Sequence, residues 1–138
     1  MGGCNSAGVK IYVSGPVSDA TTVQEVQNAV VAAGHELTLD WSADVAFAQD
    51  YASQAERSAR MAQEELAAVL EADAVLVVAS EHDGRGMFVE LGAALTRASR
   101  GELDHVVLLG EIHHESVFYF HPLVQRVPAV EDWLAQFP

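Results

Sequence analysis

The stretch AVLVVASEHDGRGMFVELGAAL, residues 74–95, decides the fold of this chain. Its first six residues, Ala74 to Ala79, are all apolar, which is typical of a strand buried on both faces of a parallel sheet. Gly84 and Gly86 follow in a short loop, and the residues after this loop are predicted to form a helix that carries Glu90 in its first turn. A strand, a glycine loop and a helix in this order place Glu90 at the carboxyl end of a parallel strand, where open α/β sheets bind their ligands.

Two interpretations of Glu90 follow from the local pattern. The partial positive charge at a helix N-terminus favours an ionised carboxylate, and a fixed, ionised carboxylate is the group needed to attack a sugar anomeric carbon. A glutamate three residues after a helix start also commonly caps its own helix. Taken alone, the local pattern favours the capping interpretation.

The alternation of strands and helices continues on both sides of this unit. Further strands are predicted at Val9–Ser14, His35–Leu39, Val106–Leu109 and Val124–Val127. Helices are predicted from Ser18 or Asp19 to Gly34, along a face formed by Ala55, Ala59, Ala62, Leu66 and Val69, through Glu90 to about Ser99, and at Val130–Phe137. We therefore predict an α/β fold with a single doubly wound parallel sheet of about five strands, flavodoxin-like or Rossmann-like.

One domain at residues 9–138 accounts for all of these elements, and residues 1–8 are expected to be a flexible N-terminal segment. Residues 40–51 have weak periodicity and are predicted to be a loop that carries Trp41 and Phe47 over the sheet ends. The sequence leaves open whether this loop closes over a site.

Composition and charge limit the possible functions. Half of the 138 residues are hydrophobic and a fifth are charged, as in a folded soluble domain. The formal net charge is -13, with 7 Lys and Arg against 20 Asp and Glu, so polymeric nucleic acid is not an expected partner. No run approaches the length of a membrane span and no signal segment is recognisable, so we expect a cytoplasmic protein without a membrane partner. The single cysteine, Cys4, fits a reducing compartment.

Common cofactor and catalytic motifs do not occur in the sequence. Gly15-Pro16 after the first strand is not the G-x-G-x-x-G of a dinucleotide site, and there is neither a Walker A sequence nor a G-x-S-x-G elbow. His113, His114 and His121 lack the spacing of a zinc site. We therefore expect no cofactor and no metal.

Acidic side chains are expected at one end of the predicted sheet. The loops after the first and third strands, around Gly15 and at Ser80–Gly86, are neighbours at the crevice. Glu65 and Asp73 are separated by about two helical turns, so both can face this side, and the Tyr12 hydroxyl can hydrogen-bond a carboxylate there. Carboxylates around one cleft suit glycosidic chemistry. The structural alternatives are a solvated helix face for Glu65, a turn for Asp73 and a core position for Tyr12.

Four segments in this order resemble the nucleoside 2-deoxyribosyltransferase family, which includes the 2'-deoxynucleoside 5'-phosphate N-hydrolases. The segments are KIYVSGP at residues 10–16, EL at 65–66, ADAVLV at 72–77 and GMFVELGAA at 86–94, within a similarity that spans about residues 10–110. The resemblance implies cleavage or transfer at the N-glycosidic bond of a nucleoside or nucleoside 5'-monophosphate, with a 2'-deoxy sugar. It also implies a homo-oligomer.

By this resemblance Glu90 is the nucleophile that attacks C1' and forms a covalent glycosyl-enzyme intermediate. Tyr12 matches a tyrosine that positions the nucleophile, Asp73 matches an acidic residue before the third strand, and Glu65 stands where the family usually has aspartate. Asp83 lies close to a loop aspartate that engages the base in the transferases. Substrate contacts are expected from the residues of the two crevice loops: Ser14, Gly15, Pro16, Ser80, Asp83, Gly84, Arg85, Gly86 and Met87.

The two crevice loops also bear on whether the substrate carries a 5'-phosphate, and on whether the protein is an enzyme at all. Ser14, Gly15, Ser80 and Arg85 offer donors for a 5'-phosphate, which favours a nucleotide substrate. Because a fold does not determine a function, a non-catalytic nucleotide-binding or sensor protein is the alternative.

Overall fold

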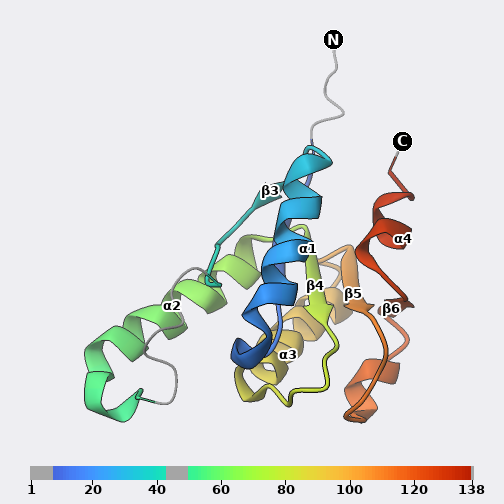
Figure 1. Cartoon of the computed structure of the whole chain (residues 1–138). Coiled ribbons are helices and arrows are strands. Elements are labelled where there is room, and N and C mark those ends of the chain that lie inside the picture. The colour runs from blue at the N-terminus through green and yellow to red at the C-terminus, as the bar shows by residue number, and fades with distance from the viewer. Residues whose placement is uncertain (1–7, 43–49, 138) are drawn as a thin grey trace.

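A parallel sheet forms the centre of the molecule (Figure 1) in the computed structural model, which describes residues 8–42 and 50–137. Its five strands are β2 (Lys10–Ser14), β3 (Glu36–Leu37), β4 (Ala74–Val78), β5 (His105–Leu109) and β6 (Val124–Val127). They lie in the order β3-β2-β4-β5-β6, and every neighbouring pair is parallel. The predicted α/β fold is confirmed, and the strand order is the flavodoxin-like one, which places the ligand crevice beside β2 and β4.

The central strand β4 is buried along its whole length, as its uninterrupted apolar sequence predicts. It pairs with β2 on one side and β5 on the other, and in the first pair Ser14 lies opposite Val77. The carboxyl ends of β2 and β4 therefore lie side by side. The segments that follow them begin at Gly15 and Ala79 and leave the sheet at the same edge.

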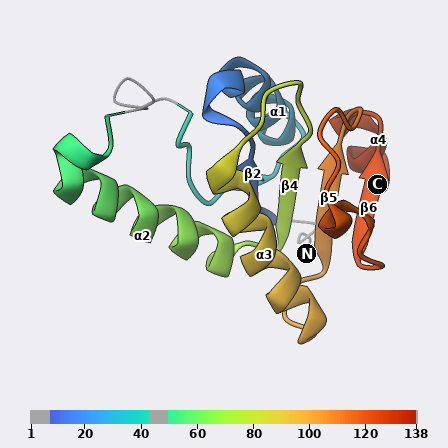
Figure 2. The same ribbon diagram turned by 90° about the horizontal axis from the view of Figure 1, so that it is seen from below.

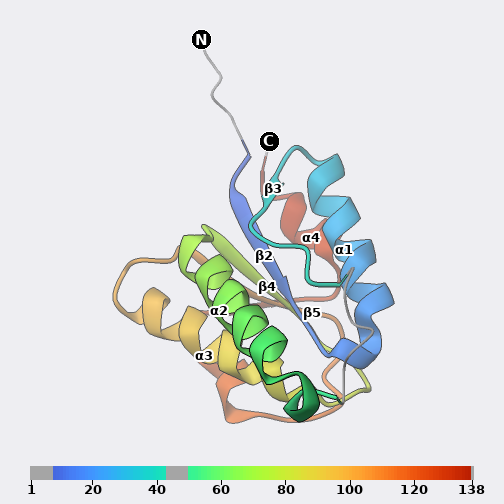
Figure 3. The same ribbon diagram turned by 90° about the vertical axis from the view of Figure 1, so that its left-hand side faces the viewer.

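Helices cover both faces of the sheet, as Figure 3 shows from the side. On one face α1 (Ala20–Ala32) contacts α4 (Val130–Leu134), and on the other α2 (Ala55–Glu71) contacts α3 (Arg85–Ser99). Three short 3-10 helices complete the described part of the chain: η1 (Val17–Asp19), η2 (Ala52–Gln54) and η3 (Val117–Phe120). No helix among residues 8–42 and 50–137 has both the length and the apolar character to cross a membrane.

Several element boundaries differ from the predicted ones. The strand predicted at His35–Leu39 is shorter than expected: β3 comprises only Glu36–Leu37, and it is an edge strand that pairs with β2 alone. The last helix ends at Leu134 rather than Phe137, and η3 lies between β5 and β6. Trp41 lies over the sheet end as predicted, and its indole N–H donates to the Val13 carbonyl at 2.8 Å. The predictions for residues 1–7 and for Phe47 lie outside the described residues.

The apolar face predicted for α2 is mostly exposed. Of its five predicted residues only Val69 is buried, whereas Ala55, Ala59, Ala62 and Leu66 are exposed. The physical reason is the course of the helix, whose amino-terminal half extends past the sheet in both Figure 1 and Figure 2. An amphipathic pattern shows which side of a helix is apolar, but not whether this chain covers it.

Candidate active site

Glu90 is buried within α3, where its carboxylate faces β2. The helix begins at Arg85, so Glu90 belongs to its second turn and not to the predicted first turn. The Glu90 carboxylate accepts hydrogen bonds from the Tyr12 hydroxyl at 2.7 Å and from the Ser14 hydroxyl at 2.5 Å. Because these bonds connect two elements 76 to 78 residues apart in the chain, the carboxylate does not serve as a helix cap.

The local sequence explains how these three side chains meet. The buried residues of α3 recur at helical spacing, at positions 87, 90, 91, 94 and 95, and Glu90 is the charged member of this otherwise apolar face. Tyr12 and Ser14 are two residues apart on β2, so both point to the same side of the sheet. Both are completely buried, and their hydroxyl groups therefore serve Glu90 rather than the solvent.

Burial and the charge of Glu90 raise the pKa of Tyr12 far above its ordinary value, with Glu65 as a further cause. The phenol therefore stays protonated and remains a hydrogen-bond donor over the whole physiological pH range. Two O–H dipoles aimed at one carboxylate stabilise its ionised form. This arrangement favours a fixed, negatively charged Glu90.

Glu65 brings a second carboxyl group to Glu90 from α2. The pKa of Glu65 is raised to about 9, chiefly by burial and then by its hydrogen bond to Glu90, with the negative charges of Glu90 and Glu64 as further causes. At neutral pH Glu65 is therefore protonated, while Glu90 carries the charge. The two groups form a pair with one proton, in which one member is suited to act as a nucleophile and the other as an acid.

A cleft of about 860 Å³ opens at this pair. Its volume lies within the range of small-molecule sites, which is roughly 300 to 1,000 Å³. One part of its wall follows β2 and consists of Gly15, Pro16, Val17 and Ser18. A second part leads into α3 and consists of Asp83, Gly84, Arg85, Gly86 and Met87. Glu65 on α2 and Glu90 on α3 also line the cleft, so the cleft holds both the carboxyl pair and most of the predicted substrate contacts.

Two of the predicted substrate contacts do not line the cleft. The Ser14 hydroxyl is buried and donates to Glu90. The Ser80 hydroxyl donates to Asp19 at 2.7 Å and accepts from the backbone N–H of His82 at 3.0 Å. Both serines thus have hydrogen-bond partners within the protein, and neither is among the residues that line the cleft.

Asp73 lies at the amino ends of the strands, whereas the cleft lies at their carboxyl ends, so its predicted position beside the cleft is wrong. The carboxylate of Asp73 accepts a hydrogen bond from the backbone N–H of Lys10 at 2.9 Å, at the amino end of β2. The physical reason is that α2 ends at Glu71 and Ala72 is extended, so the helical spacing that relates Glu65 to Asp73 does not persist. Asp73 links β2 to the segment between α2 and β4, which agrees with the alternative interpretation of Asp73 as a turn residue.

The cleft also contains residues that sequence reasoning missed as site residues. Tyr51, Ser58 and Met61 lie on or before α2, and Trp41 comes from the segment after β3. Trp41 alone had a signal in the sequence, since a large aromatic residue was predicted over the sheet ends. The others enter the site only through the course of α2, which no local pattern reveals.

A smaller, water-sized cavity of about 10 Å³ adjoins the part of the cleft wall that contains Asp83. His82, His114 and Tyr119 are among the residues that line this cavity. Tyr119 is buried, and its ring stacks on Phe88 with centroids 5.6 Å apart. Burial and the charge of Asp83 raise the pKa of Tyr119. Among residues 8–42 and 50–137, no three His, Cys, Asp or Glu side chains are grouped as a metal site.

Comparison of the chain with models of known protein families finds no match, and neither does comparison with curated proteins.

Proposed function

We propose that this protein cleaves or transfers at the N-glycosidic bond of a nucleoside or nucleoside 5'-monophosphate with a 2'-deoxy sugar. The observation that carries the proposal is the buried Glu90 carboxylate, held by Tyr12 and Ser14 beside a protonated Glu65 in a cleft of about 860 Å³. A held nucleophile and a neighbouring proton donor are what glycosyl transfer through a covalent intermediate requires.

In the first step, a Glu90 oxygen attacks C1' while the bond from C1' to the base nitrogen breaks. The base leaves with the bonding electron pair and takes the proton of Glu65, which becomes a carboxylate. The product on the protein is an ester between the sugar and Glu90. Tyr12 and Ser14 keep the attacking carboxylate in one orientation, which lowers the entropic cost of the step.

In the second step, Glu65 acts as the base. It removes a proton from water or from an N–H of an acceptor base, and the resulting nucleophile attacks C1'. The ester bond breaks, Glu90 becomes a carboxylate again, and Glu65 regains its proton. Hydrolysis and transfer therefore use the same two groups and differ only in the acceptor.

The cleft wall offers both apolar and polar contacts for a nucleoside. Trp41, Met61 and Met87 provide apolar surface against which a base can pack, and Asp83 and Arg85 provide polar groups. Of the four donors predicted for a 5'-phosphate, Gly15 and Arg85 line the cleft, whereas Ser14 and Ser80 have internal partners. A nucleoside and a nucleotide must therefore be compared directly.

The experiment is a measurement of base release by liquid chromatography and mass spectrometry from nucleosides and 5'-monophosphates, in ribo and deoxy forms. Each substrate is tested with and without an acceptor base. We expect release or exchange by the wild type and its loss, by about three orders of magnitude or more, in Glu90→Gln. Glu56→Gln, an exposed glutamate in the first turn of α2, is the matched control and should retain full activity.

A different result would favour the non-catalytic alternative. If the wild type releases no base from any substrate, while a nucleotide raises the melting temperature of both the wild type and Glu90→Gln, the protein is a nucleotide-binding or sensor protein. Release that persists in Glu90→Gln would instead exclude Glu90 as the nucleophile.

We also propose a homo-oligomer. Exposed apolar side chains on the two packed helices of one sheet face support it: Leu66 is 38% exposed, Leu70 is 60% exposed and Val89 is 60% exposed. Leu66 and Leu70 are four residues apart on α2 and therefore share one side of that helix. A second copy would cover this surface beside the cleft.

A further inference from the structure

We propose that Asp19 is a positioning residue that ties the two crevice segments together and thereby sets the shape of the substrate cleft. The role in substrate binding rests on the proposed function, whereas the tie between the segments does not. Asp19 does not line the cleft. It acts through Ser80, which lies 61 residues away in the chain.

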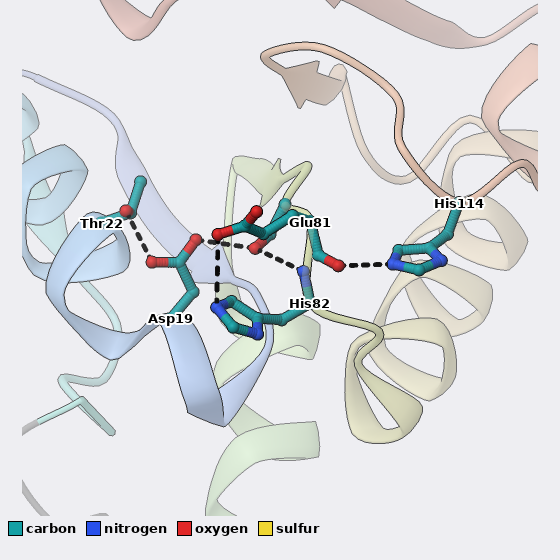
Figure 4. A network of polar contacts seen from close by, with 6 residues as sticks. Asp19, Thr22, Glu81, His82 and His114 are labelled. Atoms are coloured by element: carbon teal, nitrogen blue, oxygen red, sulfur yellow. Dashed lines mark hydrogen bonds and ion pairs between the residues drawn. The ribbon is translucent and has the colours of Figure 1, made fainter.

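The Asp19 side chain does not cap α1, although Asp19 is the residue at the start of this helix. Asp19 occupies the N-cap position of α1, where aspartate usually accepts a hydrogen bond from a backbone N–H of the first turn. It makes no such bond. Its Oδ2 atom accepts from the Ser80 hydroxyl at 2.7 Å, and its Oδ1 atom accepts from the Thr22 hydroxyl at 2.7 Å. Figure 4 shows Asp19 and Thr22 on one side of this network and the segment of Glu81 and His82 on the other.

The contact continues from Ser80 towards the cleft. The same Ser80 hydroxyl that donates to Asp19 accepts from the backbone N–H of His82 at 3.0 Å. The next residue is Asp83, at which the α3 part of the cleft wall begins. A charged acceptor strengthens the first of these bonds, and a chain of hydrogen bonds is mutually reinforcing.

The two parts of the wall also touch directly. A Cβ atom added at Gly84 would lie 3.0 Å from Pro16 Cα, so the segment before α3 packs closely against the segment after β2, and a side chain at Gly84 would require Pro16 to shift. The Asp19–Ser80 bond and the Gly84–Pro16 contact thus hold the same two segments at two points. The Asp19–Ser80 hydrogen bond can be removed by a substitution that adds no atom to the cleft.

Thr22 provides a matched control on the same carboxylate. Its bond to Asp19 has the same length and chemistry as the bond from Ser80, but it stays within the segment that starts α1. Ser80→Ala therefore removes the tie between the segments, and Thr22→Val removes only a local bond. Both variants leave Glu90, Tyr12 and Ser14 with their contacts.

The experiment compares these two variants by hydrogen exchange of residues 81–87 and by steady-state kinetics. We expect Ser80→Ala to accelerate exchange in this segment and to raise KM about tenfold, as the loss of one hydrogen bond to a charged group implies, with kcat within about twofold of the wild type. Thr22→Val should match the wild type in both measurements. A role limited to stability would lower the melting temperature without this split between KM and kcat.

Variants at Asp19 complete the test. Asp19→Ala should resemble Ser80→Ala, the double variant should be no worse than either, and Asp19→Asn, which keeps an acceptor oxygen, should restore slow exchange. Equal exchange in Ser80→Ala and Thr22→Val would overturn the tie, and faster exchange with an unchanged KM would overturn its role in binding. If the wild type has no turnover, the proposed function fails, and hydrogen exchange still decides the tie.

Discussion

Glu65 and Glu90 are the same residue type in one cleft, but their surroundings differ. Glu90 accepts hydrogen bonds from two buried hydroxyl groups, of Tyr12 and Ser14, which compensate its negative charge. Burial, the hydrogen bond to Glu90, and the charges of Glu90 and, more weakly, Glu64 all raise the pKa of Glu65, so Glu65 is the group that holds a proton. Environment therefore assigns different roles to two identical side chains, which is a common way for proteins to combine a nucleophile and an acid.

The raised pKa of Glu65 predicts a pH-dependent stability. Its pKa is near 4.5 ordinarily and about 9 in the folded protein, so between these values the folded state keeps a proton that the unfolded chain releases. The contribution of Glu65 to stability is therefore present below about pH 4.5, falls as the pH rises, and is lost above about pH 9. Glu65→Gln, which stays neutral, should gain melting temperature relative to the wild type as the pH increases from 5 to 9.

Thermal denaturation at pH 5, 7 and 9 measures this difference. Glu56 on the same helix is exposed, so the curve of Glu56→Gln should run parallel to that of the wild type. A parallel curve for Glu65→Gln as well would contradict the assignment of the proton to Glu65.

At the scale of elements, α3 both supports and shapes the site. Its buried face carries Glu90, while its amino-terminal end packs tightly against the segment after β2. The space available to a side chain therefore differs between Gly84, just before α3, and Gly92, within α3. A Cβ atom at Gly92 would meet nothing within 4 Å, whereas one at Gly84 would lie 3.0 Å from Pro16 Cα.

This difference predicts opposite effects of two identical substitutions. Gly92→Ala should stabilise the protein by about 1 kcal/mol, because alanine lowers the entropic cost of forming the middle of a helix. Gly84→Ala should destabilise it and weaken ligand binding, because the backbone of Pro16 has to move. Urea denaturation measures both changes in the free energy of unfolding. A Gly84→Ala protein as stable as the wild type would show that the two segments are not tightly packed.

At the scale of the whole molecule, the helices on both faces of the sheet carry an exposed apolar side chain. Leu70 on α2 is 60% exposed, and Val31 on α1, which covers the opposite face, is 52% exposed. If α2 forms the contact between copies, as proposed above, the two positions should respond differently to a charge. A buried, unpaired carboxylate at an interface opposes association, whereas an exposed one has little effect.

Light scattering coupled to size-exclusion chromatography tests this expectation. The wild type and Val31→Glu should be oligomeric, and Leu70→Glu should shift towards the monomer. A monomeric wild type at high protein concentration, or equal dissociation of both variants, would exclude α2 as the interface.

The fold class and the position of Glu90 at the crevice follow from the amino-acid sequence. The apolar run Ala74–Ala79, the glycine loop and the helical spacing after it report burial directly, because each pattern depends on residues that are close in the chain. The same holds for the alternation of strands and helices, which is sufficient to predict a parallel sheet. Glu90 could thus be placed at the crevice, although local patterns alone could not exclude a capping role.

The groups that meet in the site are known from the folded structure and not from the sequence. Glu65 reaches Glu90, Ser80 binds Asp19, and Asp73 stays at the amino ends of the strands, and none of these contacts has a local signature. The exposed face of α2 was equally hidden, since periodicity reports the polarity of a helix face and not what covers it. The physical reason is common to all of them: hydrogen bonds and burial between distant segments depend on how the elements pack, and packing is a property of the folded chain.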